Sequence, residues 1–297
     1  MRSLEPGVWG VLPTPFDAQT LALDEGSLDA ALDLFKKADV TGVVALGVFG
    51  EAARLTPAER AHVVTRASEV IGAHRVVVGL TALDTAAALD EAGAAVGAAR
   101  APLAALMVQI NSTSPETVVD HLYAIHRHSE LPVVLQDYPI ASGVQVSSED
   151  IVEMLRRCDC IAAVKCENPP TSLAIAELAA HTQVPLFGGL GGLGLLDELQ
   201  AGAAGAMTGF SYPEVLVKVV AAWRDGGYPA ARAVIAPWLP LINYEAQVKV
   251  GLSIRKENLR RRGVLSSAAV RPPALPFPDS LTALTDAHFR AVQGLGR

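Results

Sequence analysis

The chain has 297 residues, of which 51% are hydrophobic and 19% are charged, and its formal net charge is −7. A charged fraction below the usual ~25% excludes disorder as the main state, and the acidic balance argues against nucleic-acid binding, which calls for a basic face. The sequence contains no apolar run of the roughly 18 residues that a membrane span needs, and its first ten residues do not resemble a signal peptide. We therefore expect a globular, cytoplasmic protein that binds neither nucleic acid nor membrane.

Short apolar runs alternate with longer amphipathic segments along most of the chain. The apolar runs do not alternate polar and apolar residues, which is typical of parallel strands buried on both faces. The predicted strands cover residues 8–12, 42–46, 75–80, 103–108, 132–135, 161–164, 185–187 and 205–208. The predicted helices after them cover residues 24–38, 57–71, 84–99, 115–128, 148–156, 172–181, 193–201 and part of 213–224.

Eight strand–helix units predict an α/β protein with a (β/α)8 TIM barrel, which we favour over an open, doubly wound sheet. Beyond the barrel, the pattern predicts helices over residues 228–242, 245–262 and 280–292, with a proline-rich loop at 269–278. We expect residues 1–224 to form the barrel and residues 225–297 to form a helical extension packed on it.

Catalytic groups of such barrels lie where the strands end, at their C-terminal side. Lys165 follows the sixth predicted strand, whereas the other five lysines lie on predicted helices in solvent-facing contexts. A partly desolvated lysine can attack a ketone as the neutral amine and form a Schiff base. Its position equally allows a plain ion pair with Glu167, which is two residues further and so on the same strand face. Glu167 could move a proton or only balance the charge.

Two glycine-containing loops could bind an anion. The backbone N–H groups of Gly47, Val48, Phe49 and Gly50 can hold a carboxylate or phosphate, although a tight turn would use the same glycines. Residues 189–194 match G-x-G-x-x-G, but they follow strand seven instead of an early βαβ unit. Phosphate binding or simple flexibility is therefore a better interpretation of this loop than dinucleotide binding.

The cysteines and histidines do not predict a metal site. Cys158, Cys160 and Cys166 lack the spacing of paired C-x-x-C zinc ligands, and an odd, clustered set is typical of reduced thiols. The seven histidines form no H-E-x-x-H motif. We expect no metal and no organic cofactor.

Several segments, in order and spacing, resemble the dihydrodipicolinate synthase / N-acetylneuraminate lyase superfamily of class I aldolases. Residues 10–16 (GVLPTPF) resemble its opening strand, and residues 47–51 followed by L-T-x-x-E-R at 55–60 resemble its G-T-T-G-E segment. The A-V-K at 163–165 matches the strand that ends in the Schiff-base lysine, and residues 202–206 (GAAGA) resemble the segment before strand eight. The resemblance spans nearly the whole chain and implies a TIM barrel, an imine at Lys165 and a homotetramer.

The departures from the family pattern are also informative. Val48 and Phe49 stand where the family usually has two threonines, and Gln136 stands where it has the tyrosine of Y-N-x-P. An amide cannot carry a proton as a phenol does, so these changes argue against the lysine-pathway synthase reaction. Q-D-x-P at 136–139 together with K-x-E-x-P at 165–169 resembles members that act on 2-keto-3-deoxy sugar acids.

We therefore expect a lyase that forms an imine between Lys165 and C2 of a 2-keto acid, and then eliminates water or releases pyruvate by retro-aldol cleavage. Residues 47–50 are expected to bind the carboxylate. Glu167 is the first candidate for moving the proton, and Tyr138 is the second because it would share a strand face with Gln136. Four further residues are expected to contact the substrate hydroxyls: Gln136, Asp137, Gly188 and Thr208.

Four alternatives remain open on the sequence. They are a dihydrodipicolinate synthase-like condensation of pyruvate with an aldehyde, a phosphate-binding barrel, a non-catalytic barrel that binds a keto acid, and a purely structural oligomer.

Overall fold

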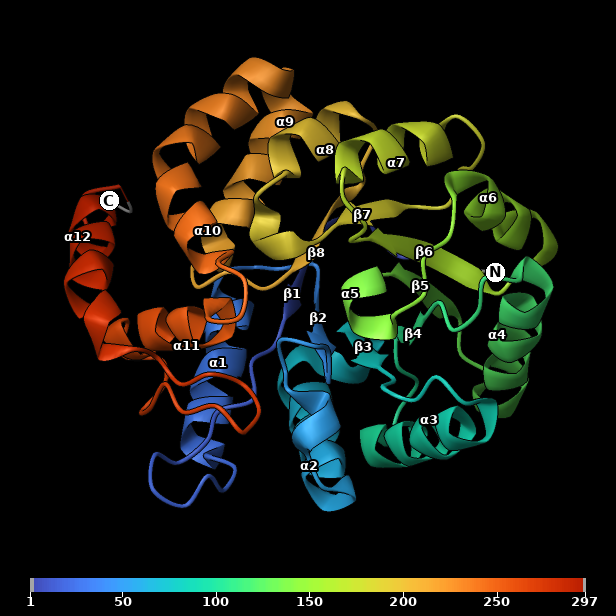
Figure 1. Ribbon diagram of the computed structural model, residues 1–297, viewed down its shortest axis with the longest axis horizontal. Coiled ribbons are helices and arrows are strands. Elements are labelled where there is room, and N and C mark those ends of the chain that lie inside the picture. Colours follow the sequence, from blue (N-terminus) through green and yellow to red (C-terminus); the bar gives the residue numbers. More distant parts are fainter. Residues whose placement is uncertain (1–2, 296–297) are drawn as a thin grey trace.

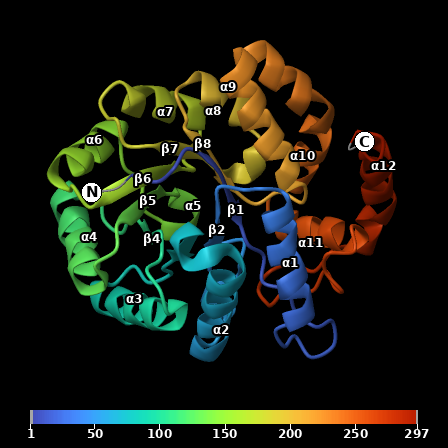
Figure 2. The same cartoon turned by 180° about the vertical axis from the view of Figure 1, so that it is seen from behind.

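The computed structural model describes residues 3–295 and contains a closed barrel of eight parallel strands in chain order. Each strand pairs with the next one, and β8 pairs with β1 to close the barrel. Figures 1 and 2 show the strands at the centre with helices around them. The predicted (β/α)8 barrel is therefore confirmed. The strands are β1 (Gly7–Val11), β2 (Gly42–Ala45), β3 (Val76–Gly79), β4 (Ala105–Gln109), β5 (Val133–Asp137), β6 (Ile161–Cys166), β7 (Leu186–Gly188) and β8 (Gly205–Thr208).

Several of the helices between the strands begin at polar residues that cap them. Asp24 accepts a hydrogen bond from the backbone of Ser27 at the start of α1, and Thr56 with Glu59 forms a capping box on α2. These helices are α1 (Glu25–Lys37), α2 (Pro57–Ala67), α3 (Thr85–Ala99), α4 (Pro115–Ser129), α6 (Ser148–Arg157), α7 (Thr171–Ala179), α8 (Leu195–Gln200) and α9 (Pro213–Ile235). A short helix, α5 (Pro139–Ser142), was not predicted because four residues are too few to show a helical period.

The C-terminal helices differ in their bounds from the prediction. Helix α9 continues past residue 224 through a break at Gly227, whose φ is 62° and ψ −155°. After it come α10 (Leu239–Glu245), α11 (Gly251–Arg261) and α12 (Thr282–Val292). The predicted helix over 245–262 begins later because Lys249 has a positive φ of 72° in the turn before α11. In both views α10, α11 and α12 gather on one side of the barrel, near α1 (Figures 1 and 2).

Two apolar clusters fix the direction of every strand side chain. Residues such as Val44, Met107, Val134 and Phe187 form the cluster inside the barrel, whereas a larger cluster lies between the strands and the helices. Because successive strand side chains alternate, residues two positions beyond an inward-facing residue also face the barrel axis. This alternation decides which polar residues reach the mouth of the barrel.

Candidate active site

Three polar residues stand side by side near the C-terminal ends of adjacent strands. Gln109 of β4 is in register with Gln136 of β5, and Gln136 is in register with Lys165 of β6. Each follows an inward-facing residue by two positions, so all three face the barrel axis. The neighbour of Lys165 on the other side is Phe187. The polar row therefore covers one side of the mouth and ends at an apolar wall.

Lys165 is buried and carries an ion pair. Its side chain is 6% exposed, and its Nζ lies 3.0 Å from Oε2 of Glu167. Gln136 donates its Nε2–H to the same carboxylate oxygen at 2.6 Å. A Cβ at Gly189 would clash with Glu167, so this glycine leaves room for the carboxylate. Glu167 is thus held against the lysine and is placed to accept the proton that an ammonium must lose before it can attack a ketone.

The loop after β2 forms a turn with free amides. The backbone N–H of Gly50 donates to the carbonyl of Gly47 at 2.9 Å, and that of Glu51 donates to Val48 at 3.1 Å. Thr14 donates its hydroxyl to the carbonyl of Gly50 at 2.6 Å. Within residues 3–295, the amides of Val48 and Phe49 have no hydrogen-bond partner. Two adjacent free N–H groups at a strand end can bind a carboxylate.

A cavity of about 340 Å³ opens beside the polar row. It lies over the ends of β2 to β5, and its wall includes Gly47, Val48, Met107, Gln109 and Gln136. The cavity therefore joins the loop with free amides to the glutamine that contacts Glu167. A small organic acid fits such a space, since ligand sites begin at about 300 Å³.

Five of the eight predicted binding residues do not line this cavity, and neither do Lys165, Glu167 and Tyr138. Two of the five, Phe49 and Gly50, belong to the loop whose Gly47 and Val48 do line it. The other three are Asp137, Gly188 and Thr208. Asp137 is in register with Cys166, which faces the helical layer, and burial together with the charge of Glu167 raises the pKa of Asp137 to about 6. Gly188 abuts the buried carboxylate of Glu198. Thr208 accepts a hydrogen bond from the amide of Gly191 at 2.7 Å. These residues support the wall of the barrel.

Tyr138 does not share a strand face with Gln136, so that expectation is wrong. Strand β5 ends at Asp137, and Tyr138 precedes α5 with φ −140° and ψ 79°. The phenol is nevertheless within electrostatic reach of the site, because burial and the charge of Glu167 raise its pKa while Arg255 lowers it. Tyr138 thus remains a candidate for proton transfer by its proximity alone.

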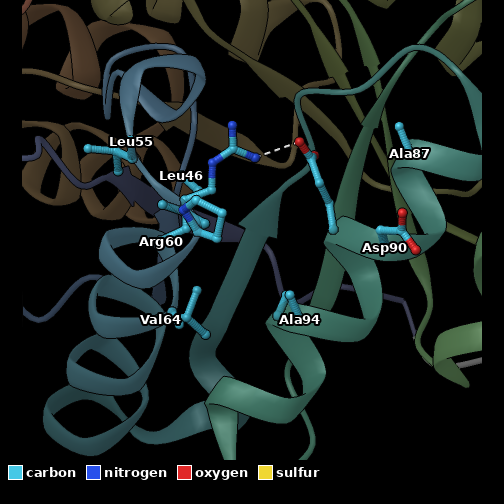
Figure 3. Close-up of a pocket in the computed structure, with 11 residues that line it drawn as sticks. Leu46, Leu55, Arg60, Val64, Ala87, Asp90 and Ala94 are labelled. Carbon is cyan, nitrogen blue, oxygen red and sulfur yellow. Dashed lines mark hydrogen bonds and ion pairs between the residues drawn. The ribbon is translucent and has the colours of Figure 1, made fainter.

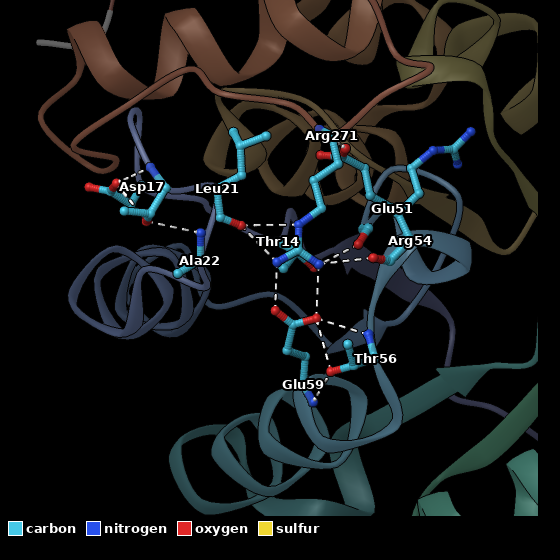
Figure 4. Close-up of polar contacts among 11 residues, drawn as sticks. Thr14, Asp17, Leu21, Ala22, Glu51, Arg54, Thr56, Glu59 and Arg271 are labelled. Atoms are coloured by element: carbon cyan, nitrogen blue, oxygen red, sulfur yellow. Dashed lines mark hydrogen bonds and ion pairs between the residues drawn. The ribbon is translucent and has the colours of Figure 1, made fainter.

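Lys165 is not the only buried lysine among the described residues, contrary to the expectation from the sequence. Lys256 on α11 is fully buried, with its Nζ bonded to the Glu51 carboxylate and, at 2.8 Å, to the carbonyl of Ala269. The other oxygen of Glu51 accepts the backbone N–H of Arg271 at 2.8 Å (Figure 4). Lys256 is therefore charge-paired and does not itself line the cavity, and it connects the loop after β2 to the extension. No local pattern in α11 distinguishes this lysine from a surface one.

Arg255, the residue before it, is a mouth residue that sequence reasoning missed. Its guanidinium carbon lies 5.2 Å from the ring centre of Phe49, and a Cβ at Gly191 would press against its Nη2. Its side chain is 15% exposed, and Glu245 at 3.9 Å supplies its ion pair. None of its guanidinium N–H groups has a hydrogen-bond partner in the described part of the chain. The extension thus places a cation near the anion-binding loop. The sequence analysis missed Arg255 because it interpreted this segment as lying outside the barrel.

A second cavity, of about 380 Å³, lies between α2 and α3. The ion pair between Arg60 and Glu91, 2.5 Å long, closes one side of it (Figure 3). Its floor is apolar and includes Leu46 and Val64. None of the predicted catalytic or binding residues lines this cavity, so the smaller cavity at the barrel mouth is the candidate site.

Other kinds of site find no support in the described residues. Residues 3–295 contain no group of three or more acidic, cysteine or histidine side chains that could hold a metal ion. No helix within that range is long and apolar enough to cross a membrane. The G-x-G-x-x-G segment follows β7 and forms a 3₁₀ turn at Leu190–Gly192, which is not the first turn of a dinucleotide-binding βαβ unit.

Comparison with known proteins agrees with this geometry. The chain is 32% identical, over 279 residues, to the L-2-keto-3-deoxyarabonate dehydratase of Azospirillum brasilense, a match that covers 90% of this chain and 88% of that protein. It is 28% identical over 281 residues to the 4-hydroxy-tetrahydrodipicolinate synthase of Kineococcus radiotolerans, with 93% and 90% covered. The crystal structure of a dihydrodipicolinate synthase from Rhodopseudomonas palustris superposes with a TM-score of 0.88 at 30% identity, and covers 98% of this chain and all of that one.

The family model gives the same result over nearly the full length. Residues 5–287 match the model of the dihydrodipicolinate synthetase family, which confirms the resemblance drawn from the sequence segments. Relatives that match this chain carry the names of a 2-keto-3-deoxy acid dehydratase and a 4-hydroxy-2-oxoglutarate aldolase. The chain therefore belongs to the dihydrodipicolinate synthetase family and is a lyase.

Proposed function

We propose that this lyase forms a Schiff base between Lys165 and C2 of a 2-keto acid, and that its substrate is a 2-keto-3-deoxy sugar acid. The observation that carries the proposal is the buried group formed by Lys165, Glu167 and Gln136 at the mouth of the barrel. The name of the Azospirillum relative, a dehydratase of such an acid, supports the choice of substrate.

The first step needs a neutral amine and a polarised ketone. Glu167 takes one proton from the Lys165 ammonium, and the freed nitrogen pair attacks C2 of the substrate. The C2 oxygen takes one proton from the nitrogen and a second from Glu167 and leaves as water, so that a C=N bond replaces C=O and Glu167 is again a carboxylate. The amides of Val48 and Phe49 hold the C1 carboxylate, and the charge of Arg255 favours the anionic substrate at the mouth.

The second step uses the iminium as an electron sink. Glu167 removes a proton from C3, and the electron pair of that C–H bond passes into the enamine. In dehydration the enamine then expels the C4 hydroxyl, which takes up a proton and leaves as water. In retro-aldol cleavage C3 keeps its proton, and Glu167 takes the proton of the C4 hydroxyl instead. The C3–C4 bond then breaks, its electron pair forms the enamine, the C4 fragment leaves as an aldehyde, and the enamine takes up the proton at C3. Hydrolysis of the imine returns Lys165 and the product.

The residues around the lysine favour elimination or cleavage over the synthase reaction. The positions of the family's threonines hold Val48 and Phe49, and Gln136 replaces the tyrosine, so the usual hydroxyl groups for proton transfer are missing. Glu167 is the one acid within contact distance of Lys165 in the described residues. That the enzyme is cytoplasmic and needs no cofactor stays a prediction from the sequence. That it is a homotetramer stays a prediction from the family resemblance.

A substrate panel tests the proposed function. Purified enzyme is incubated with 2-keto-3-deoxy pentonates and hexonates of both C4 configurations, and the products are assayed separately for pyruvate and for the dehydrated keto acid. We expect turnover of at least one such acid, and its loss in Lys165→Gln. Turnover only of pyruvate with an aldehyde would support the condensing synthase instead. A ligand-induced rise in Tm without any product would support a non-catalytic keto-acid barrel.

A further inference from the structure

Gln109 carries a hydrogen-bonding group that the protein leaves unused. The residue ends β4 and is partly exposed. Its Oε1 is buried without a partner, and its Nε2 has no hydrogen-bond partner within residues 3–295. A buried amide oxygen without a partner costs free energy, so such an atom at a cavity wall is typical of a ligand contact.

The other polar side chains in the cavity wall are already engaged. Glu51 is bonded to Lys256 and Arg271, and Thr81 gives its hydroxyl to Glu91 at 2.5 Å. Arg54, at the exposed rim, donates its Nε–H to the carbonyl of Pro272 at 3.0 Å. Gln136, the remaining amide, is bonded to Glu167. The buried side-chain group without a partner in this wall is therefore Oε1 of Gln109, part of a neutral amide.

The chemistry of an amide selects its ligand. An amide offers both a donor and an acceptor, which match a hydroxyl group, whereas a carboxylate only accepts and is best met by a cation. The register places Gln109 two strands from Lys165, about 10 Å across the barrel wall, with Gln136 between them. The part of a keto acid beyond C4 can therefore lie over β4 while C2 is bound to Lys165.

We propose that the amide of Gln109 binds a hydroxyl group at C5 of the substrate, so that the cavity over β4 and β5 selects 2-keto acids with a hydroxylated end. This proposal rests on the proposed function, because it takes the imine at Lys165 as given. In this proposal the enzyme discriminates among substrates through C5, a carbon that takes no part in the bond-making and bond-breaking steps.

Three substrates that differ only at C5 test the proposal. They are 2-keto-3-deoxypentonate, which ends in CH₂OH; 4-hydroxy-2-oxopentanoate, which ends in CH₃; and 4-hydroxy-2-oxoglutarate, which ends in a carboxylate. For the wild-type enzyme we expect kcat/KM for the better C4 epimer to be about tenfold to a hundredfold higher for the hydroxylated substrate than for the other two, since one hydrogen bond and one unpaired amide separate them.

The variant Gln109→Met keeps the length of the side chain and removes its amide. We expect it to lower kcat/KM for the hydroxylated substrate to about the level of the methyl substrate, and to leave the methyl substrate within about threefold of wild type. Gln200→Met, the same substitution on the exposed side of α8, is the matched control and should change none of these values. Gln109→Ser keeps a smaller hydrogen-bonding group and provides a second variant if the methionine variant does not fold.

Trapping of pyruvate with borohydride distinguishes a failure of the proposed role of Gln109 from a failure of the proposed imine at Lys165. Pyruvate has no C5, so its adduct on Lys165 should form equally in wild type, Gln109→Met and Gln109→Ser. Normal trapping together with unchanged discrimination in the variants would overturn the role of Gln109 alone. Preference of the wild-type enzyme for the methyl or the carboxylate end would overturn it as well. Absence of any adduct on Lys165 in wild type would refute the proposed function, and with it this inference.

Discussion

At the residue scale, the site contains buried charged side chains, and the reactivity of each one depends on the group with which it is paired. Lys165 and Glu167 form a contact of 3.0 Å with both side chains less than 10% exposed. Removal of one partner of such a pair leaves an unpaired buried charge, which costs far more than the pair itself contributes. Substitutions here must therefore keep the shape of the side chain if chemistry is to be separated from folding.

Glu167→Gln tests whether this carboxylate moves the proton. The amide can keep contacts with Gln136 and Lys165 but cannot act as a base, so we expect kcat to fall by about 10²- to 10⁴-fold. Steady-state kinetics on the best keto-deoxy acid measures this, with borohydride trapping of pyruvate to show that Lys165 is still reactive. A kcat within twofold of wild type would mean that another group, with Tyr138 as the first candidate, moves the proton.

Glu198 makes stability depend on pH. It is fully buried, Thr171 donates to one of its oxygens at 2.6 Å, and burial raises its pKa from the ordinary 4.5 to about 7. The folded state therefore binds the proton more tightly than the unfolded state, so the stabilisation is present at low pH and is lost as pH rises from about 4.5 to about 7. At roughly 1.4 kcal/mol per unit of pKa, the loss amounts to about 3 kcal/mol.

Glu198→Gln should remove this slope. Urea unfolding at pH 5 and pH 8 measures it, and we expect the variant to gain stability relative to wild type at pH 8 but little at pH 5. The substitution can also shift the free energy of unfolding by the same amount at every pH. The quantity to compare between the two proteins is therefore the change in that free energy from pH 5 to pH 8. Parallel pH profiles of the two proteins would contradict the assignment.

At the element scale, strands and helices were largely predictable, whereas the environment of single side chains was not. Buried parallel strands are uniformly apolar, so the short apolar runs in the sequence alone locate β1 to β8 within a few residues. The burial of Lys256 depends on Glu51, 205 positions earlier in the chain, and no local pattern carries that information. The direction of Asp137 and the place of Tyr138 depend on where β5 ends, and strand ends are the least certain part of a sequence-based assignment.

Helix α11 contributes charged side chains to the site as well as packing against the barrel. It brings Arg255 to the mouth and Lys256 to Glu51, which is two residues beyond the free amides of Val48 and Phe49. Lys256 also lies 4.4 Å from the ring centre of Phe16. The extension and the loop after β2 thus form one electrostatic unit.

Lys256→Met tests this unit. Loss of the ammonium leaves the Glu51 carboxylate buried without its charge partner, and we expect the free energy of unfolding to fall by about 3–5 kcal/mol. The double variant Glu51→Gln/Lys256→Met removes both charges and should recover most of that loss. Urea denaturation curves of the four proteins of this cycle give the coupling energy, and additive effects would show that the two residues do not interact.

At the scale of the whole molecule, barrel and extension share contacts throughout the C-terminal region. Arg262 binds Glu214 at 2.7 Å, and Arg271 stacks on Phe16 and binds Glu59 at 2.5 Å. The division into residues 1–224 and 225–297 remains a proposal, and it cuts α9 three residues before the break at Gly227.

A truncated chain of residues 1–224 tests whether the barrel is independent of the extension. It would lose the partners of Glu51, Glu59 and Glu214 together and expose apolar surface, so we expect it to be aggregated or to unfold without cooperativity. Circular dichroism during thermal unfolding and size-exclusion chromatography measure this. A soluble fragment with a sharp transition would show that the extension is a separate unit.

The proposed reaction depends above all on Lys165 acting as a nucleophile towards 2-keto acids. Its most direct test is incubation of the enzyme with pyruvate and borohydride, digestion, and peptide mass spectrometry, with Lys165→Gln as the control. We predict a single reduced adduct, located on Lys165, that is absent from the variant and absent without borohydride. A wild-type enzyme that turns over keto acids but carries no adduct on Lys165, or that carries adducts spread evenly over its exposed lysines, would contradict the claim.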